Sequence, residues 1–413
     1  MTILGLDLEL VAELVTAVSG RAVDPAEVDE RFASSAWTSI SEPGDRHAGA
    51  LVGALGPVAA LTGVIDRTPA ADLAAAMTDS GAIDALAPAE LQEALDRWTP
   101  RLSSESCLRA LRQAARYDVR LLIPTDPLWP PGLDDLGPFG PRALWVRGAD
   151  AALASVDAGI ALVGARAATG YGEHVTMEAS AGLVDRGYTI ISGAAYGIDG
   201  MAHRAALASH GFTIAFLAGG LDKFYPSGHE QLLTRIAETG AVISEVPCGT
   251  APTKWRFLQR NRLIAASSQA TIVLEAGWRS GSLNTAGHAS ALGRPLGAVP
   301  GPVTSVASAG CHRLIRDYDA VCVTNADEMA ELAPLDSRTT TGGADAEKRA
   351  RTGPSPELVR LFDALSTRSP RTTTDIAARA GLSISLTQSL LGALQLEGEV
   401  RESERGWIRV RPT

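Results

Sequence analysis

Residues 159–172, GIALVGARAATGYG, and residues 188–199, YTIISGAAYGID, decide the fold expected of this chain. Each is a short apolar run, rich in β-branched side chains, that ends in a glycine-rich turn and leads into a segment with helical spacing. The pattern returns at 213–222 (TIAFLAGGLD), 241–249 (AVISEVPCG), 271–277 (TIVLEAG) and 295–301 (PLGAVPG). Repeated units of this kind form a parallel sheet with helices on both faces. The predicted core is therefore an extended Rossmann-like parallel sheet of the α/β class.

Different patterns flank this core. Residues 1 to about 100 read as short helices, and two strands, near Arg120–Ile123 and Ala143–Arg147, lead into the sheet. Residues 336–353 are polar and rich in Gly and Thr, as in a linker. The remaining segment predicts three helices and a strand pair, the order found in a winged helix. We predict an N-terminal helical domain (1–105), a Rossmann-like domain (106–335), a linker (336–353) and a winged-helix domain (354–413).

The net charge of −10 over 413 residues is unevenly distributed. Residues 1–158 hold 12 arginines against 23 acidic residues, whereas the rest of the chain is nearly balanced and can carry a local basic groove. Four isolated cysteines show neither zinc-ligand nor disulfide-framework spacing, so no metal site is expected. The N-terminus does not resemble a signal peptide. Residues 48–65 form one uncharged run. We interpret it as two short packed helices that turn near Gly56-Pro57, rather than as a membrane span.

Ligands of such sheets bind at the carboxyl ends of the strands, where this sequence places its glycines and polar residues. In the loop GARAATGYG (164–172), small residues let backbone amides approach an anion, and Arg166 adds a guanidinium. The loop is not GxGxxG, and no acidic residue ends the strand Tyr188–Ile191 to bind a ribose, so a dinucleotide is disfavoured. The glycines could also serve only to pack a helix closely. We expect no cofactor.

Two further loops carry polar groups. In SGAAYGIDGMAH (192–203), Ser192 and Gly193 end a strand, and Asp199 and His203 share one helical face. A structural hydrogen bond between the last two is favoured over a catalytic pair, because no nucleophile accompanies them. The second loop begins a helix with Ser280, Gly281 and Ser282, which predicts another anion-binding site.

The densest cationic segment is KWRFLQRNRLIAASS (254–268). Basic groups interleaved with aromatic rings suit single-stranded nucleic acid, since phosphates meet cations while unstacked bases lie on rings. The alternative is that Phe257, Leu258 and Ile264 belong to the core and the arginines form a solvated face. The cations and neighbouring polar or aromatic residues of this segment are Lys254, Trp255, Arg256, Phe257, Arg260, Asn261 and Arg262.

Residues 120–332 resemble the bacterial DNA-processing protein A family (DprA, also called Smf). The resemblance rests on eight motifs in the family's order: GARAATGYG, SGAAYGID with AHRAAL, AGGLDKFYPSGH, ISEVPCG, RFLQRNRLIA, VLEAGWRSGSLNTA, LGRPLGAVPG and SAGCHRLI. The chain departs from the common pattern at Ala194-Ala195-Tyr196 and at Leu258-Gln259. The flanking domains fit the family's optional modules, the N-terminal one being SAM-like, but their motifs are less specific.

The resemblance implies a cytoplasmic, non-catalytic protein that binds single-stranded DNA without sequence preference, protects it and helps to load RecA in natural transformation or recombination. It implies DNA contacts by Arg166, Ser192, Gly193, Lys254, Phe257, Asn261 and the turn Ser280–Ser282, to which the cationic segment adds Arg260 and Arg262. It also implies a homodimer formed through the last helix and strand of the Rossmann-like domain, including Leu314, Ile315, Val321 and Val323. No membrane association is implied.

Two other functions remain open. Related Rossmann-like folds hydrolyse nucleoside monophosphates with a PGGxGTxxE-type loop; here that position reads GWRSGSLNTA, without the glutamate, although Glu245 and Glu275 end nearby strands. A transcription regulator would read bases through the third helix of the winged helix. That helix, SISLTQSLLGALQLEG, offers only Ser, Thr, Gln388 and Gln395, so this function is disfavoured.

Overall fold

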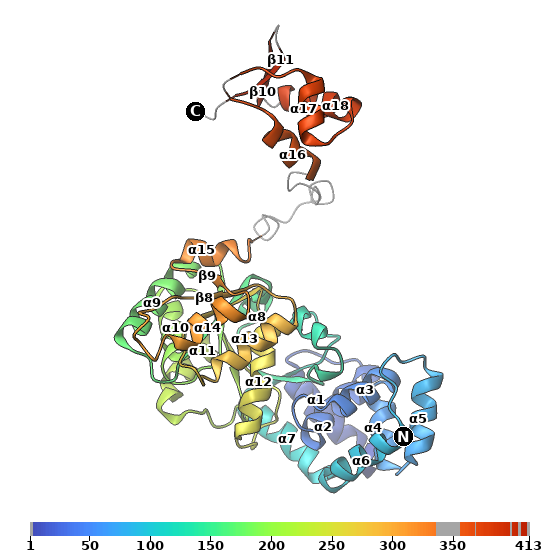
Figure 1. Cartoon of the computed structure of the whole chain (residues 1–413). Coiled ribbons are helices and arrows are strands. Elements are labelled where there is room, and N and C mark those ends of the chain that lie inside the picture. Colours follow the sequence, from blue (N-terminus) through green and yellow to red (C-terminus); the bar gives the residue numbers. More distant parts are fainter. Residues whose placement is uncertain (1–2, 336–355, 368, 397–398, 404–405, 411–413) are drawn as a thin grey trace. The chain divides into compact units, whose positions relative to one another are not determined.

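The computed structural model describes residues 3–335 and 356–410, apart from 368, 397–398 and 404–405. The chain forms two compact units, Met1–Leu335 and Asp336–Thr413 (Figure 1). The linker expected at 336–353 lies outside the described residues.

The first unit is built on a nine-stranded sheet with the order β1-β2-β6-β5-β4-β3-β7-β8-β9. The strands are β1 (Arg120–Leu122), β2 (Leu144–Gly148), β3 (Gly159–Gly164), β4 (Thr189–Ser192), β5 (Thr213–Leu217), β6 (Ala241–Ser244), β7 (Ala270–Glu275), β8 (Leu296–Ala298) and β9 (Val321–Cys322). Strands β3 to β9 pair in parallel, as predicted. The sheet is nevertheless mixed, because β2 pairs antiparallel with both β1 and β6.

The order of strands reverses at β3. From β3 the chain adds β4, β5 and β6 on one side, then returns to place β7, β8 and β9 on the other. In open α/β sheets such a reversal leaves a crevice outside the carboxyl ends of the strands. The loops after β3 and β7 are therefore the expected position of a ligand site.

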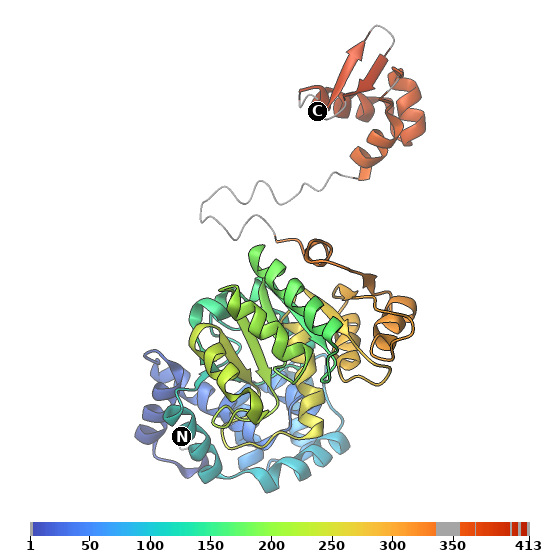
Figure 2. The same ribbon diagram turned by 90° about the vertical axis from the view of Figure 1, so that its left-hand side faces the viewer.

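Helices cover both faces of the sheet (Figure 2). Alternate side chains of β3 point to opposite faces: Ile160 and Leu162 belong to one core cluster, and Ala161 and Val163 to another. The helices of this part are α8 (Asp150–Ala154), α9 (Gly170–Asp185), α10 (Ile198–Ala208), α11 (Glu230–Thr239), α12 (Lys254–Ala266), α13 (Ser282–Ala291), α14 (Ala309–Asp317) and α15 (Ala326–Glu331).

The N-terminal segment is helical, as predicted. Its helices are α1 (Leu8–Ser19), α2 (Pro25–Ile40), α3 (Arg46–Leu55), α4 (Pro57–Ile65), α5 (Ala70–Asp79), α6 (Pro88–Trp98) and α7 (Ser104–Arg116). Aspartate or serine side chains cap several of them, for example Asp7 on α1 and Ser103 on α7. The boundary expected at residue 105 falls inside α7.

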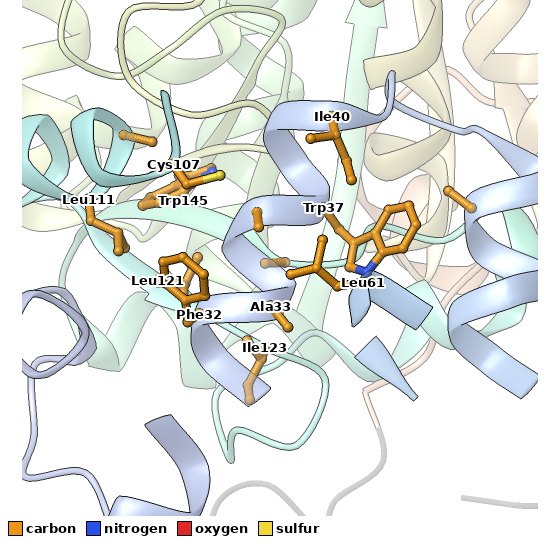
Figure 3. Close-up of a cluster of buried hydrophobic side chains, with 14 of the residues drawn as sticks. Phe32, Ala33, Trp37, Ile40, Leu61, Cys107, Leu111, Leu121, Ile123 and Trp145 are labelled. Carbon is orange, nitrogen blue, oxygen red and sulfur yellow. The ribbon is translucent and has the colours of Figure 1, made fainter. Parts of the chain in front are cut away.

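These helices share one core with the first two strands. Phe32 and Trp37 of α2 and Leu111 of α7 belong to the same buried cluster as Leu121 of β1 and Trp145 of β2 (Figure 3). The Trp145 indole N–H donates to the Thr38 hydroxyl at 3.2 Å. Beside this cluster, the buried guanidinium of Arg31 on α2 is paired with Asp126, which follows β1. The helices are therefore packed directly against the antiparallel edge of the sheet.

The uncharged run forms two helices, α3 and α4, bent by 112° across Gly56, which has φ +78°. This confirms the predicted pair of short helices. Within the described residues, no single helix is both long and apolar enough to cross a membrane; α3 and α4 meet the length and composition test only when taken together.

The second unit contains α16 (Pro356–Ala364), α17 (Thr373–Ala380) and α18 (Ile384–Leu396), followed by β10 (Val400–Ser403) and β11 (Gly406–Arg409). The two strands pair antiparallel. The Thr372 side chain caps α17, and Gly381, with φ +62°, ends it. This order of three helices and a hairpin is the one expected for 354–413; its assignment as a winged helix stays a prediction.

Candidate functional site

A cavity of about 570 Å³ lies at the reversal of strand order. Its wall is formed by the loop after β3, the loop after β7 and one side of α12. The sequence predicted a binding site at this edge, and the cavity brings three of the quoted loops together. The predicted site residues in its wall are Arg166, Phe257, Arg260, Asn261, Ser280, Gly281 and Ser282.

Arg166 is an exposed cation of this wall. Its guanidinium carbon lies 5.1 Å from the centre of the half-buried Phe257 ring. A guanidinium within about 6 Å of a ring face is attracted by the ring's negative π-cloud. Phe257 therefore helps to hold Arg166 in the cavity wall, and the guanidinium covers a face of the ring that a base would need. The side chains of Trp255 and Trp278 are exposed.

Arg260 lies beneath the cavity and is buried. Its Nη1 donates to the carbonyl oxygens of Gly193 and Phe216, both at 2.6 Å. Burial lowers the pKa of Arg260 to about 10, while the charge of Asp199 acts in the opposite direction. The guanidinium stays charged at neutral pH, so it adds positive potential to the floor of the cavity.

The turn at Ser280–Ser282 starts α13 without a side-chain cap on the helix. The Ser280 and Ser282 hydroxyls lie 2.7 Å apart. Asn261 of α12 holds α13, since its amide donates to the Asn284 side chain at 3.1 Å. The Leu283 and Asn284 N–H groups of this turn donate to the Ser280 and Gly281 carbonyls, at 3.2 and 3.1 Å, so the turn offers an anion its two hydroxyls and the positive end of the helix dipole. The exposed Arg279 stands beside this turn in the cavity wall. Sequence reasoning missed Arg279, although it is the one cation in the quoted loop GWRSGSLNTA.

Two predicted contacts of the second loop are structural. Ser192 is fully buried and its hydroxyl donates to the Leu162 carbonyl at 2.6 Å. Gly193 is buried against Arg260, where a Cβ atom would lie 2.2 Å from Nη1. Both residues therefore support the cavity floor through their packing and do not reach its surface.

The two remaining cations of the predicted set, Lys254 and Arg262, lie outside the cavity wall. Lys254 is exposed on the first turn of α12. Arg262 is 2% exposed and donates to both carboxylate oxygens of Glu245, at 2.8 and 2.7 Å, and to the Phe139 carbonyl at 2.9 Å. The sequence predicted a DNA contact for Arg262, but its guanidinium is buried and donates to protein oxygens.

The acidic groups near the cavity are also engaged. Glu275 is 2% exposed and accepts hydrogen bonds from the Thr169 N–H and hydroxyl, at 2.8 and 2.6 Å. This contact fixes the loop that carries Arg166. Glu245 is bound to Arg262 as described, so both carboxylates that kept a hydrolase open are occupied by protein groups.

Asp199 and His203 are buried, and within the described part of the chain no hydrogen bond joins them. Asp199 accepts weakly from the Ala195 N–H, and His203 Nδ1 contacts the Thr213 hydroxyl at 2.6 Å. The expected mutual hydrogen bond is thus wrong, because each side chain finds a different partner. Burial lowers the pKa of His203 to about 3. Within the described part of the chain, no group of three or more His, Cys, Asp or Glu side chains could hold a metal ion.

Of the four residues predicted at the dimer interface, two are buried in the core and two are at least partly exposed. Leu314 and Val323 are buried in the cores of their own unit, and Ile315 packs partly against one of them. Val321 is 49% exposed on β9, which ends the sheet. Because Leu314 and Val323 are already packed, a surface here would consist of Val321 and the exposed part of Ile315.

Comparison with known proteins places residues 120–334 in the family model of DNA recombination-mediator protein A. A Mycobacterium tuberculosis protein assigned to DNA processing protein DprA is 43% identical over 303 residues, which is 71% of this chain and 77% of that one. Protein Smf of Escherichia coli is 36% identical over 76% of this chain and 82% of its own length. The structure of DNA processing protein A from Streptococcus pneumoniae superposes with a TM-score of 0.58 and 26% identity, covering 75% of this chain and 99% of that one.

Proposed function

This chain belongs to the DNA recombination-mediator protein A family, and from that membership we propose that it binds single-stranded DNA, without sequence preference, in the cavity at the carboxyl ends of β3 and β7. The proposed contact set is Arg166, Asn261, Arg279 and the turn Ser280–Ser282, with Lys254 at the approach along α12. Arg260 and Phe257 hold this set in position.

The observation that carries the proposal is the placement of Arg166. It is an exposed guanidinium, held over the Phe257 ring at 5.1 Å, across a cavity that also contains the hydroxyls of an uncapped helix start. Arg279 adds a second exposed cation. Backbone phosphate is recognised by cations and hydroxyl groups, without reading a base. The exposed ring of Trp255 offers a face on which bases of any type could stack, whereas the Trp278 ring is covered by the Arg313 guanidinium at 5.1 Å.

The family resemblance adds the wider role. We propose that the protein acts without catalysis in the cytoplasm, protects single-stranded DNA in transformation or recombination, helps to load RecA and forms a homodimer in which β9 takes part. The exposed edge of β9 at Val321 is compatible with such pairing.

The rival function, hydrolysis of a nucleoside monophosphate, requires a carboxylate that can exchange protons with a substrate. Glu275 and Glu245 are buried and bonded to Thr169 and Arg262, so neither is presented to the cavity in this arrangement. Asp199 is the carboxylate that does line the cavity; burial raises the pKa of its carboxyl, with Arg260 opposing the shift, and it accepts a hydrogen bond from the Ala195 N–H at 3.4 Å. These contacts favour binding over hydrolysis.

The proposal is tested by fluorescence anisotropy with labelled oligo-dT and the full chain. Arg166→Ala is expected to weaken binding and to make the slope of log K against log salt shallower by about 0.7, the value for one lost phosphate contact on a single strand. The matched control is Arg235→Ala, which removes an exposed arginine of α11 outside the cavity wall. Equal affinities and slopes for Arg166→Ala and wild type would contradict the assignment. Wild-type turnover of a nucleoside monophosphate that is lost in Asp199→Asn, at the carboxylate that lines the cavity, would favour the hydrolase.

A further inference from the structure

The N-terminal region is acidic as a whole, but one segment of it is strongly basic. Residues 97–116 contain five arginines and a single acidic residue, Glu105. Three of them, Arg109, Arg112 and Arg116, follow one another on α7 at spacings of three and four residues and are exposed. This spacing places them on one face of the helix. The only acidic residue of this segment, Glu105, lies one turn before Arg109 on the same helix, so arginines outnumber acidic residues on this face.

Next to that face lies a second cavity, of about 330 Å³, between α2, α7 and the loop that follows β6. Arg101, Arg109 and Arg256 line it, together with serine and threonine side chains and the backbone of the loop. The wall contains no aspartate, glutamate or aromatic side chain. Ser39, also in the wall, has a buried hydroxyl oxygen without a hydrogen-bond partner. Such a wall suits a phosphate and offers no platform for a base.

The charge of this cavity is only partly neutralised. Glu42 accepts from Arg256 at 3.0 and 2.9 Å and is paired with Arg101 at 2.9 Å, so one carboxylate serves two guanidinium groups. Burial pushes the pKa of Glu42 up, but the hydrogen bond and charges of Arg256 and Arg101 outweigh it and leave the pKa below its usual value. Arg109 is paired with the highly exposed Glu105, an ion pair worth little in water. A net positive charge remains at neutral pH.

The first turn of α12 connects the two cavities. Arg256 lines the second cavity, while Phe257 and Leu258, the next two residues, line the first. Trp255 on the same turn is 55% exposed and borders a third hollow of about 450 Å³ beside α6. The charged side chains of this hollow are Arg97 and Arg101 and their ion-pair partners Asp45 and Glu42. A chain leaving the first cavity along this turn would meet an exposed ring and then the arginines of α7.

The relative position of these groups is fixed by the core. Cys107 and Leu111 of α7 are buried in the cluster that also contains Trp145 of β2 (Figure 3). This apolar face holds α7 against the sheet, while Arg109, Arg112 and Arg116 stay exposed. Binding here would not require the cost of ordering a mobile segment.

We propose that the cavity lined by Arg101, Arg109 and Arg256 is a second phosphate-binding site, which extends the path of single-stranded DNA from the first cavity across Trp255 and onto α7. The extension rests on the proposed function, since it takes the same polymer. It gives the acidic N-terminal region a basic surface with a direct role in DNA binding.

The test compares a short and a long oligo-dT, of about 5 and about 16 nucleotides, within the range of lengths that single-strand sites cover. The full chain carries R101A together with R109A. We expect unchanged affinity for the short oligonucleotide. For the long one, the salt slope should become shallower by about 1.4, which is two phosphate contacts and about 25-fold in affinity per tenfold change in salt. R109K, which keeps the charge, should recover part of the loss.

The outcomes separate the two proposals. Wild-type protein that binds neither oligonucleotide refutes the proposed function and the extension with it. Wild-type binding with no effect of R101A/R109A on the long oligonucleotide refutes the extension alone. Equal weakening for both lengths also refutes it, because the substitutions would then act on the first cavity. An unchanged thermal unfolding profile of the double variant, measured by circular dichroism, excludes loss of fold, and R235A with R204A, on α11 and α10, controls for net charge.

Discussion

Arg262 offers a direct way to separate a buried ion pair from a DNA contact. Its guanidinium makes two hydrogen bonds to Glu245, at 2.8 and 2.7 Å, and a third to the Phe139 carbonyl, and it is almost completely buried. Arg262→Met removes the cation and leaves the Glu245 carboxylate without its partner. Breaking a buried pair on one side costs about 3–5 kcal/mol in unfolding free energy, because the remaining charge loses its compensation.

The same reasoning predicts that the double variant Arg262→Met/Glu245→Leu recovers most of that loss, since an apolar pair of similar volume is often neutral. Urea unfolding followed by tryptophan fluorescence gives the free energies, and oligo-dT anisotropy at low temperature gives the salt slope of the folded protein. We expect a stability loss that is rescued in the double variant and an unchanged slope. A slope shallower by about 0.7 with unchanged stability would show that Arg262 contacts phosphate and would refute the structural role.

Two further predictions concern stability. Burial lowers the pKa of His203 to about 3, below the ordinary value of 6.5, so the unfolded state binds more protons between these two pH values. The free energy of unfolding is therefore highest above about pH 6.5 and falls as the pH drops, by up to about 1.4 kcal/mol per pH unit. Urea titrations at several pH values should show a flatter dependence for His203→Gln. Phe32→Ala should cost about 3–5 kcal/mol and lower the melting temperature of the N-terminal helices and the sheet together; two separated transitions in calorimetry would contradict the shared core.

Features set by local sequence were predicted from it. The six strands from β3 to β8 and the glycine turns after them follow from short apolar runs and their punctuation, and the cavity edge follows from the parallel order of those strands. The two helices at Gly56-Pro57 follow from the same kind of signal.

Features that depend on partners distant in the sequence were not predicted from it. Arg166 and Arg260 both appear in the sequence as cations beside small or aromatic residues, yet Arg260 is buried because the Gly193 and Phe216 carbonyls, 67 and 44 residues away, accept its hydrogen bonds. Arg262 is buried for a similar reason, through Glu245. The antiparallel pairing of β2 with β6 likewise joins segments about a hundred residues apart, which no local pattern reports.

The core that joins the N-terminal helices to the sheet limits how this chain could be shortened, by engineering or by evolution. Trp145 is fully buried on β2, and its indole N–H donates to the Thr38 hydroxyl of α2. A chain without the helices would expose that ring, together with Leu121, on the outermost strands of the sheet, where apolar edges invite aggregation. Loss of the helical region would therefore have to be accompanied by polar substitutions in residues 120–145, so the two segments are constrained to change together.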